Sequence, residues 1–229
     1  TIREKVINAL SSLNPSWSIC MLIQEEKKNP IMVIARDSFG IRPLSIIKTE
    51  LGYIASSENF SLKNNSHNIA RELERGEIIF IDENGIESSF INKNKESPCI
   101  FEHIYFSFPS GLFSNISVPS ARIALGRQLA KEEKEKGMLI KDAVVVYAPD
   151  SALLAAEGYA TESNLRLIHR LIRSHYQPSP RSFMARPDSR ALAVDSKHNT
   201  INDDIFENKI VLIDDSIVRG DTSSKLIKL

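Results

Sequence analysis

The order of hydrophobic and polar positions near the C-terminal end predicts a buried strand that ends in two acids. Ile210 to Ile213 form an uninterrupted apolar run of mostly β-branched residues. Such a run is typical of a strand covered on both faces of a parallel sheet. Asp214 and Asp215 follow it directly, at the carboxyl edge of the sheet, where ligands bind in open α/β folds. The pattern therefore predicts a ligand site at these two carboxylates.

A second segment repeats this order of strand, turn and helix. Residues 143–147 read AVVVY, a run typical of a buried strand, and Pro149 to Ser151 form a sharp turn. The small residues of 152–160 then predict a helix. Amides and hydroxyls at the start of a helix can hold a phosphate group. Two interpretations stay open for this turn: a phosphate-binding loop, or a capped helix start that binds nothing.

The segment after the two acids offers a cradle for an anion. Ser216 to Thr222 contains hydroxyl side chains, Gly220 and a run of backbone amides, and a helix is expected from Ser223. Such amides suit a phosphate, while a pair of carboxylates suits the hydroxyls of a sugar or a magnesium ion. The combination predicts a site for a phosphorylated sugar. The alternative is a solvated turn in which the aspartates cap the next helix.

The N-terminal third predicts a β-rich layer packed on one helix. Apolar residues recur at helical spacing from Thr1 to Leu13, and strand-length apolar pieces joined by tight turns follow. These pieces are WSICMLI, PIMVIARD, RPLSIIK, ELGYIASSE and GEIIFIDENG. The polar stretch 92–97, ahead of Pro98, predicts a linker. We therefore expect two domains, at residues 1–96 and 97–229.

Composition narrows the class of protein. The 229 residues carry zero net charge, with 25% charged and 42% hydrophobic residues, which suits an ordinary globular protein. A balanced charge gives no support to binding of nucleic acid or of a membrane surface. The two cysteines lack CxxC spacing, and the first residues lack the apolar core of a secretory signal. We expect a reduced, cytoplasmic compartment. Because the first residue is not methionine, we also expect a piece of a longer protein.

Several motifs, in the same order, resemble a known family. KIVLIDDSIVRGDT at 209–222 resembles the phosphoribosyl-pyrophosphate signature of type I phosphoribosyltransferases. RDSFGIRPLSI, IASSE and RGEIIFID, in the first third, are similar to the second half of the glutaminase domain of the glutamine phosphoribosyl-pyrophosphate amidotransferases. PCIFEHIYFSFPSG at 98–111 resembles the aromatic motif with which that family enters its transferase domain.

The resemblance implies a fold and an activity. The fold is an incomplete N-terminal-nucleophile glutaminase part, of α+β class with an αββα sandwich, over residues 1–96. An α/β type I phosphoribosyltransferase domain with a parallel sheet follows over 97–229. The implied activity converts phosphoribosyl pyrophosphate and glutamine, or ammonia, to 5-phosphoribosylamine in the first step of de novo purine biosynthesis. Purine nucleotides are the implied inhibitors, and a homo-oligomer is the implied assembly.

The family also implies roles for residues of this chain. Asp214 and Asp215 bind the ribose hydroxyls, and together with Ser151 they hold Mg²⁺. The pyrophosphate is received by Asp150, Ser151 and Ala152. The 5′-phosphate is cradled by Ser216, Ile217, Val218, Arg219, Gly220, Asp221 and Thr222. A loop that closes over the sugar carries Arg173, Tyr176 and Arg181. Cys99 stands where some members have a ligand of a [4Fe-4S] cluster. No catalytic residue of the glutaminase can be named, because the family's nucleophile lies upstream of Thr1.

The chain departs from the family pattern at three places. Asp221 replaces a threonine, SFPSG replaces ARPDS after the aromatic motif, and Pro178 and Pro180 lie in a lengthened closing loop. Asp221 and the altered closing loop favour one alternative, a paralogue or sensor that binds phosphoribosyl pyrophosphate without turnover. The other alternative is a base-salvage phosphoribosyltransferase, which has no use for a β-rich first third.

Overall fold

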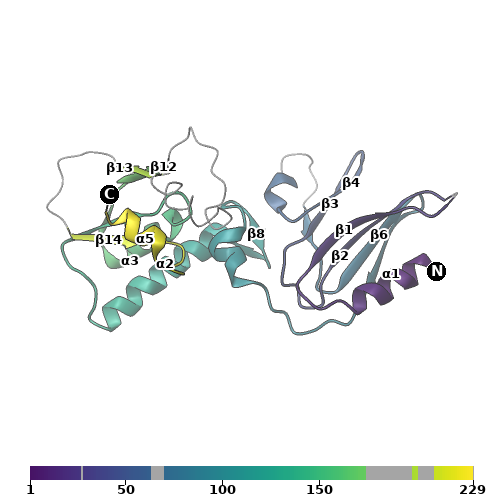
Figure 1. Cartoon of the computed structure of the whole chain (residues 1–229), viewed down its shortest axis with the longest axis horizontal. Helices are drawn as coiled ribbons and strands as arrows, with labels where there is room; N and C mark the ends of the chain where they lie inside the picture. Colours follow the sequence, from purple (N-terminus) through teal and green to yellow (C-terminus); the bar gives the residue numbers. More distant parts are fainter. Residues whose placement is uncertain (27, 63–69, 174–197, 201–208, 229) are drawn as a thin grey trace. The chain divides into compact units, whose positions relative to one another are not determined.

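The computed structural model describes residues 1–26, 28–62, 70–173, 198–200 and 209–228 (Figure 1). The chain divides into two compact units, Thr1–Val118 and Pro119–Leu229. Residues just after position 96 belong to the first unit, because the amides of Ser97 and Cys99 donate hydrogen bonds to the carbonyl groups of Phe39 and Ile41 at 3.0 and 3.1 Å. The boundary after residue 96, which the polar stretch 92–97 suggested, stays a prediction.

In its described part, the first unit has a helix near the N-terminus and two larger antiparallel sheets (Figure 1). Helix α1 (Ile2–Ser11) begins at a capping box between Thr1 and Glu4. The larger sheet has the order β1 (Ser18–Ile23), β2 (Ile31–Arg36), β6 (Glu77–Asp82), β7 (Gly85–Phe90). The smaller sheet has the order β4 (Gly52–Ser56), β3 (Ser45–Thr49), β5 (Arg71–Glu72). A 3₁₀ turn at Asn59–Leu62, a π-helical turn at Glu102–Phe106 and the hairpin of β8 (Leu112–Phe113) with β9 (Ile116–Ser117) complete its described elements.

Each face of the larger sheet has its own core. The core between α1 and the sheet consists of Val6, Leu10, Val33, Ala35, Ile78 and Phe80. The core between the two sheets consists of Ile34, Leu44, Ile46, Leu73 and Ile79. Successive residues of a strand point to opposite faces, so β2 buries Val33 on one side and Ile34 on the other. This double burial explains why the sequence of β2 is an unbroken apolar run rather than an alternating one.

Arg36, at the end of β2, is buried and fastens two loops of the first unit. Its Nε donates to the carbonyl of Arg42 at 2.8 Å, and one Nη donates to the carbonyl of Leu73 at 2.7 Å. The other Nη donates to the carbonyl of Gly40 at 2.8 Å and pairs with Glu72 at 3.0 Å. Gly40 has φ of +67°, a conformation that favours glycine. A planar guanidinium with several fixed donors suits this role, which a lysine could not fill.

The second unit is built on a short parallel sheet. Its order is β11 (Arg166–Leu167), β10 (Ala143–Tyr147), β14 (Lys209–Ile213), and every residue of β10 is buried. The sheet is accompanied by helices α2 (Val118–Glu135), α3 (Leu153–Ser163) and α5 (Asp221–Leu226). An antiparallel pair joins β12 (Leu171–Arg173) to β13 (His198–Thr200). The expectation of full burial for residues 210–213 is wrong: β14 lies at the edge of the described sheet, and Ile210 is 55% exposed.

Helices α2 and α3 touch through their backbones. A Cβ on Gly126 would lie 1.9 Å from the carbonyl oxygen of Ala155, and a Cβ on Gly158 would lie 2.0 Å from that of Ile123. Two glycines therefore allow an approach that any other residue would block.

No helix among the described residues is long and apolar enough to cross a membrane.

Candidate functional site

The ends of two adjacent parallel strands bring the predicted phosphate turn and the two acids to one edge of the sheet. Tyr147, the last residue of β10, is aligned with Ile213, the last residue of β14. The pairing continues past the strands, since the amide of Ala148 donates to the carbonyl of Ile213 at 2.9 Å. The turn from Pro149 and the acids from Asp214 therefore leave the sheet side by side, at the carboxyl edge where α/β folds bind ligands.

Asp214 and Asp215 form a compact acidic pair. The amide of Asp215 donates to Oδ1 of Asp214 at 2.9 Å, and the hydroxyl of Ser216 donates to Oδ1 of Asp215 at 3.0 Å. Burial, and then the negative charge of Asp215, raise the pKa of Asp214 above its usual value, and the amide of Asp215 offsets only part of this rise. Negative charge is thus concentrated where a cation would relieve it.

The residues fit a magnesium ion that is held jointly with a ligand. No group of three or more His, Cys, Asp or Glu side chains in the described parts of the chain is arranged to hold a metal. Magnesium, however, is commonly bound by one or two carboxylates together with the phosphates of a substrate. Asp214 and Asp215 supply such carboxylates, and Ser151 lies in the turn after the neighbouring strand.

The loop after the acids exposes its side chains. Ile217 and Val218 are 75% and 84% exposed. Gly220 has φ of +76° and precedes α5, which begins two residues earlier than the sequence predicted. The loop therefore turns at a position that glycine suits. Arg219 is exposed and Thr222 is half-buried, while the side chain of Asp221 lies outside the described part.

The turn after β10 is organised around one ion pair. Nη1 of Arg173 lies 3.2 Å from Oδ2 of Asp150, and both side chains are largely accessible to solvent. Ser151 is half-buried, and Ala152 is fully buried with its amide donating to the carbonyl of Ala148 at 3.2 Å. Helix α3 then starts at Leu153 without a side-chain cap. The other two residues of the predicted closing loop, Tyr176 and Arg181, lie outside the described residues.

Sequence reasoning missed a tyrosine and a histidine at the same edge. The hydroxyl of Tyr147 lies 2.8 Å from Nδ1 of His169, and the two rings meet edge to face. A tyrosine that closes an otherwise aliphatic strand was the only local signal of this pair. Their contact depends on the register between β10 and β11, which the sequence pattern does not give.

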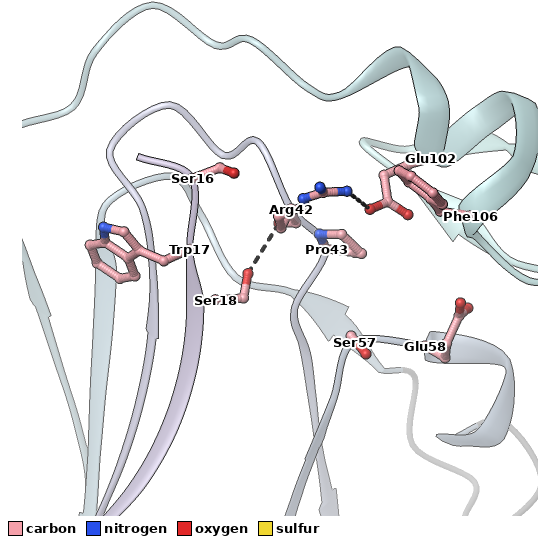
Figure 2. Close-up of a pocket in the computed structure, with 9 residues that line it drawn as sticks. All are labelled: Ser16, Trp17, Ser18, Arg42, Pro43, Ser57, Glu58, Glu102 and Phe106. Carbon is pink, nitrogen blue, oxygen red and sulfur yellow. Dashed lines mark hydrogen bonds and ion pairs between the residues drawn. The ribbon is translucent and has the colours of Figure 1, made fainter. Parts of the chain in front are cut away.

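The first unit contains a polar cleft of about 510 Å³. Its lining, labelled in Figure 2, consists of Ser16, Trp17, Ser18, Arg42, Pro43, Ser57, Glu58, Glu102 and Phe106. Nη1 of Arg42 donates to the buried carboxylate of Glu102 at 2.9 Å, and the guanidinium lies 5.2 Å from the centre of the Phe106 ring. This pair joins two of the motifs that carry the resemblance, RDSFGIRPLSI and PCIFEHIYFSFPSG. The charges of Arg42 and Glu102 balance each other within the cleft.

Cys99 does not by itself make a metal centre. Its side chain is half-buried and reduced, and the chain has only one other cysteine, Cys20 on β1. A [4Fe-4S] cluster takes four thiolates, so these residues alone cannot hold one.

Comparisons with known proteins agree with this architecture. No family model matches the chain. Amidophosphoribosyltransferases from Pyrococcus horikoshii and Bacillus subtilis are 34% and 32% identical to it, over 99% and 100% of its residues. A solved structure of the glutamine phosphoribosylpyrophosphate amidotransferase of B. subtilis, complexed with ADP and GMP, covers the whole chain with a TM-score of 0.79 and 32% identity. The chain spans 46–48% of the length of these three proteins.

The parallel sheet of the second unit, with polar turns beyond its carboxyl edge, is consistent with the phosphoribosyltransferase class of α/β folds. Its matches extend through the antiparallel first unit as well, over the full length of the chain. Over its whole length the chain is similar to about half of the amidophosphoribosyltransferases that it matches.

Proposed function

We propose that this chain is the part of an amidophosphoribosyltransferase that binds phosphoribosyl pyrophosphate. The reaction joins ammonia, released from glutamine, to the sugar and yields 5-phosphoribosylamine for de novo purine synthesis. The names of its relatives support this proposal. The observation that carries it is the alignment of Tyr147 with Ile213, which sets the Pro149 turn beside Asp214 and Asp215. A sugar with phosphates at both ends requires such neighbouring groups.

Each part of the edge has a role in the proposed chemistry. Asp214 and Asp215 bind the ribose hydroxyls, and the amides of residues 216–222 bind the 5′-phosphate. Asp150, Ser151 and Ala152 border the pyrophosphate. A Mg²⁺ held by Asp214, Asp215 and Ser151 would neutralise charge on the pyrophosphate oxygens. Arg173 and Arg181 add cations, and with Tyr176 they belong to the loop that closes over the sugar.

The bond changes at C1 of the ribose are simple. The C1–O bond to pyrophosphate breaks, its electron pair leaves with the pyrophosphate, and the nitrogen of ammonia forms the new C1–N bond and then loses a proton to water. Positive charge develops on the sugar, while negative charge develops on the leaving group. The protein's contribution is therefore to position the sugar and to stabilise the departing anion.

The first unit fits the glutaminase half of the family. Its helix, large sheet and small sheet, in contact through two cores, support three layers of an αββα sandwich for residues 1–96. The glutaminase chemistry is assigned to no residue of this chain. Cys99 stays a predicted cluster ligand, and no step of the proposed reaction depends on it.

Inhibitors, assembly and location are also proposed for this chain from its resemblance to the family. Purine nucleotides are the proposed inhibitors, since the solved relative was complexed with ADP and GMP. A homo-oligomer and a cytoplasmic location complete the proposal.

The direct test measures the binding of phosphoribosyl pyrophosphate, in the presence of Mg²⁺, to the intact protein by calorimetry. Asp214→Asn should weaken binding at least tenfold, because it removes one of the two charges that face the sugar and the metal. Asp142→Asn is the matched control. Asp142 is an exposed acid just before β10, at the opposite end of the strand. Equal affinity in the wild type and Asp214→Asn would overturn the assignment of the site.

A second candidate function is binding of phosphoribosyl pyrophosphate without turnover. Asp221 favours it, because a carboxylate in a phosphate loop repels its ligand. Release of pyrophosphate with ammonia as the nitrogen donor separates the two functions. Binding without release would support the sensor, and release at a rate that saturates with ammonia would support the enzyme. The base-salvage alternative does not account for the similarity of the first unit to amidophosphoribosyltransferases.

A further inference from the structure

The pair of Tyr147 and His169 adds a third strand, β11, to the carboxyl edge of the sheet where the candidate site lies. Strands β11 and β10 are parallel, with Leu167 aligned with Val145, and the amide of Ile168 donates to the carbonyl of Val145 at 2.9 Å. His169 therefore emerges from β11 at the level where Tyr147 ends β10. Three neighbouring strands thus carry polar groups at their carboxyl ends: His169, the Pro149 turn, and the acids after β14.

The tyrosine fixes the orientation of the imidazole. Tyr147 is 8% exposed, whereas His169 is exposed to solvent. Burial, and then the charge of Asp150, raise the pKa of the Tyr147 phenol, so the hydroxyl keeps its proton at neutral pH. It can then donate to Nδ1 of His169, at 2.8 Å. Neutral imidazole that accepts at Nδ1 carries its hydrogen on Nε2.

Within the described part of the chain, the second nitrogen of His169 can bind a ligand. Among the residues that the structure describes, no hydrogen bond engages Nε2 of His169. An N–H donor therefore projects from the β11 side of the edge, and it persists if the imidazole becomes protonated. Arg173, four residues further on, reaches the same turn through its contact with Asp150. Two donors from one short segment thus contact the end of β10 and the turn that follows it, His169 through Tyr147 and Arg173 through Asp150.

We propose that His169, oriented by Tyr147, binds the pyrophosphate group of the substrate and distinguishes it from the 5′-phosphate. This inference rests on the proposed function. Strand β10 lies between β11 and β14, so the acids and the loop 216–222 occupy one side of the Pro149 turn and His169 the other. His169 is a ligand-binding residue in this arrangement, and Tyr147 is a positioning residue that acts through it.

The test uses two probes, each of which binds at a different one of the two proposed phosphate sites. Inorganic pyrophosphate with Mg²⁺ reports the β11 side, and ribose 5-phosphate reports the β14 side, both by calorimetry of the intact protein. His169→Ala should lower the affinity for pyrophosphate about tenfold, because a hydrogen bond to a charged group is lost. It should leave the affinity for ribose 5-phosphate unchanged. His169→Gln should recover most of the loss, since an amide can accept from Tyr147 and still donate to the anion.

Tyr147→Phe tests the positioning role. The buried ring stays in place, so the fold is retained, and the affinity for pyrophosphate should fall about threefold through loss of the orienting hydrogen bond. The double variant should bind no more weakly than His169→Ala alone, because the tyrosine acts through the histidine.

The outcomes separate this inference from the function on which it rests. If the wild type binds neither probe, the proposed function fails, and the inference fails with it. If the wild type binds both and His169→Ala binds pyrophosphate equally well, the inference alone is overturned. An equal loss of both probes in His169→Ala, or additive losses in the double variant, would also overturn it.

Discussion

The contact between α2 and α3 makes a sharp prediction about Gly158. In Gly158→Ala the new Cβ would lie 2.0 Å from the carbonyl oxygen of Ile123, whereas ordinary contact begins at 3.4 Å. The two helices must therefore separate by about 1.4 Å. The obstacle is backbone, which cannot rotate away as a flexible side chain would.

The expected loss of stability is large for the addition of one methyl group. Overpacking costs about 1–3 kcal/mol, and a rigid backbone obstacle places this change near the upper value. For a chain of this length, about 3 kcal/mol lowers Tm by roughly 6–12 °C. The affinity for phosphoribosyl pyrophosphate should fall as well, because α3 begins directly after the turn of Asp150 and Ser151.

Thermal unfolding by calorimetry provides the measurement. Glu157→Ala, an exposed substitution in the same helix, is the control and should change Tm by less than about 2 °C. A variant with both Gly126→Ala and Gly158→Ala should lose less than the sum of the two single changes, because one separation of the helices relieves both clashes. A Tm for Gly158→Ala within about 2 °C of the wild type would refute the reasoning.

Two further predictions concern pH and buried acids. Asp214→Asn should raise the Tm of the ligand-free protein at pH 7. Burial and the charge of Asp215 raise the pKa of Asp214. The charged carboxylate therefore destabilises the fold above this raised pKa, whereas no such cost exists below the ordinary pKa of an aspartate. A lower Tm would contradict this. Burial alone would raise the pKa of Glu77, but hydrogen bonds, chiefly from Arg71, outweigh it and lower the pKa. The stabilisation by the charged Glu77 is present above about pH 4.5 and is lost as pH falls through the lowered pKa. Glu77→Gln should therefore cost about 2 kcal/mol at pH 7 and reduce the fall of Tm at acid pH. An unchanged fall of Tm at acid pH would contradict this prediction.

The strands with continuous apolar runs were predictable from the sequence. The pieces PIMVIARD, RPLSIIK and GEIIFIDENG became β2, β3 and β6, because strands buried on both faces need apolar residues at every position. Strand β7 was missed, since GIESSF is largely exposed and pairs with β6 mainly through backbone hydrogen bonds. Its existence depends on the hairpin with β6 rather than on its own side chains.

The candidate site was predictable in its local parts and not in its contacts between segments. The adjacency of Asp214 and Asp215 is a property of the chain, and their place after a strand follows from the apolar run. RDSFGIRPL contains two arginines and an aspartate that could pair within the segment. The structure instead pairs Arg36 with Glu72 and Arg42 with Glu102. Both partners are distant in sequence, so only the assembled fold brings them together.

Arg36 has a consequence for the way in which the first unit comes apart. One side chain holds the carbonyl groups of residues 40, 42 and 73 at once, so neither of the two segments can detach while the other stays in place. If either segment opens, the buried guanidinium of Arg36 loses its partners. Leaving a buried cation unpaired costs far more than breaking a single neutral hydrogen bond. The segments around residues 36–42 and 71–73 therefore open cooperatively, as one local unfolding unit.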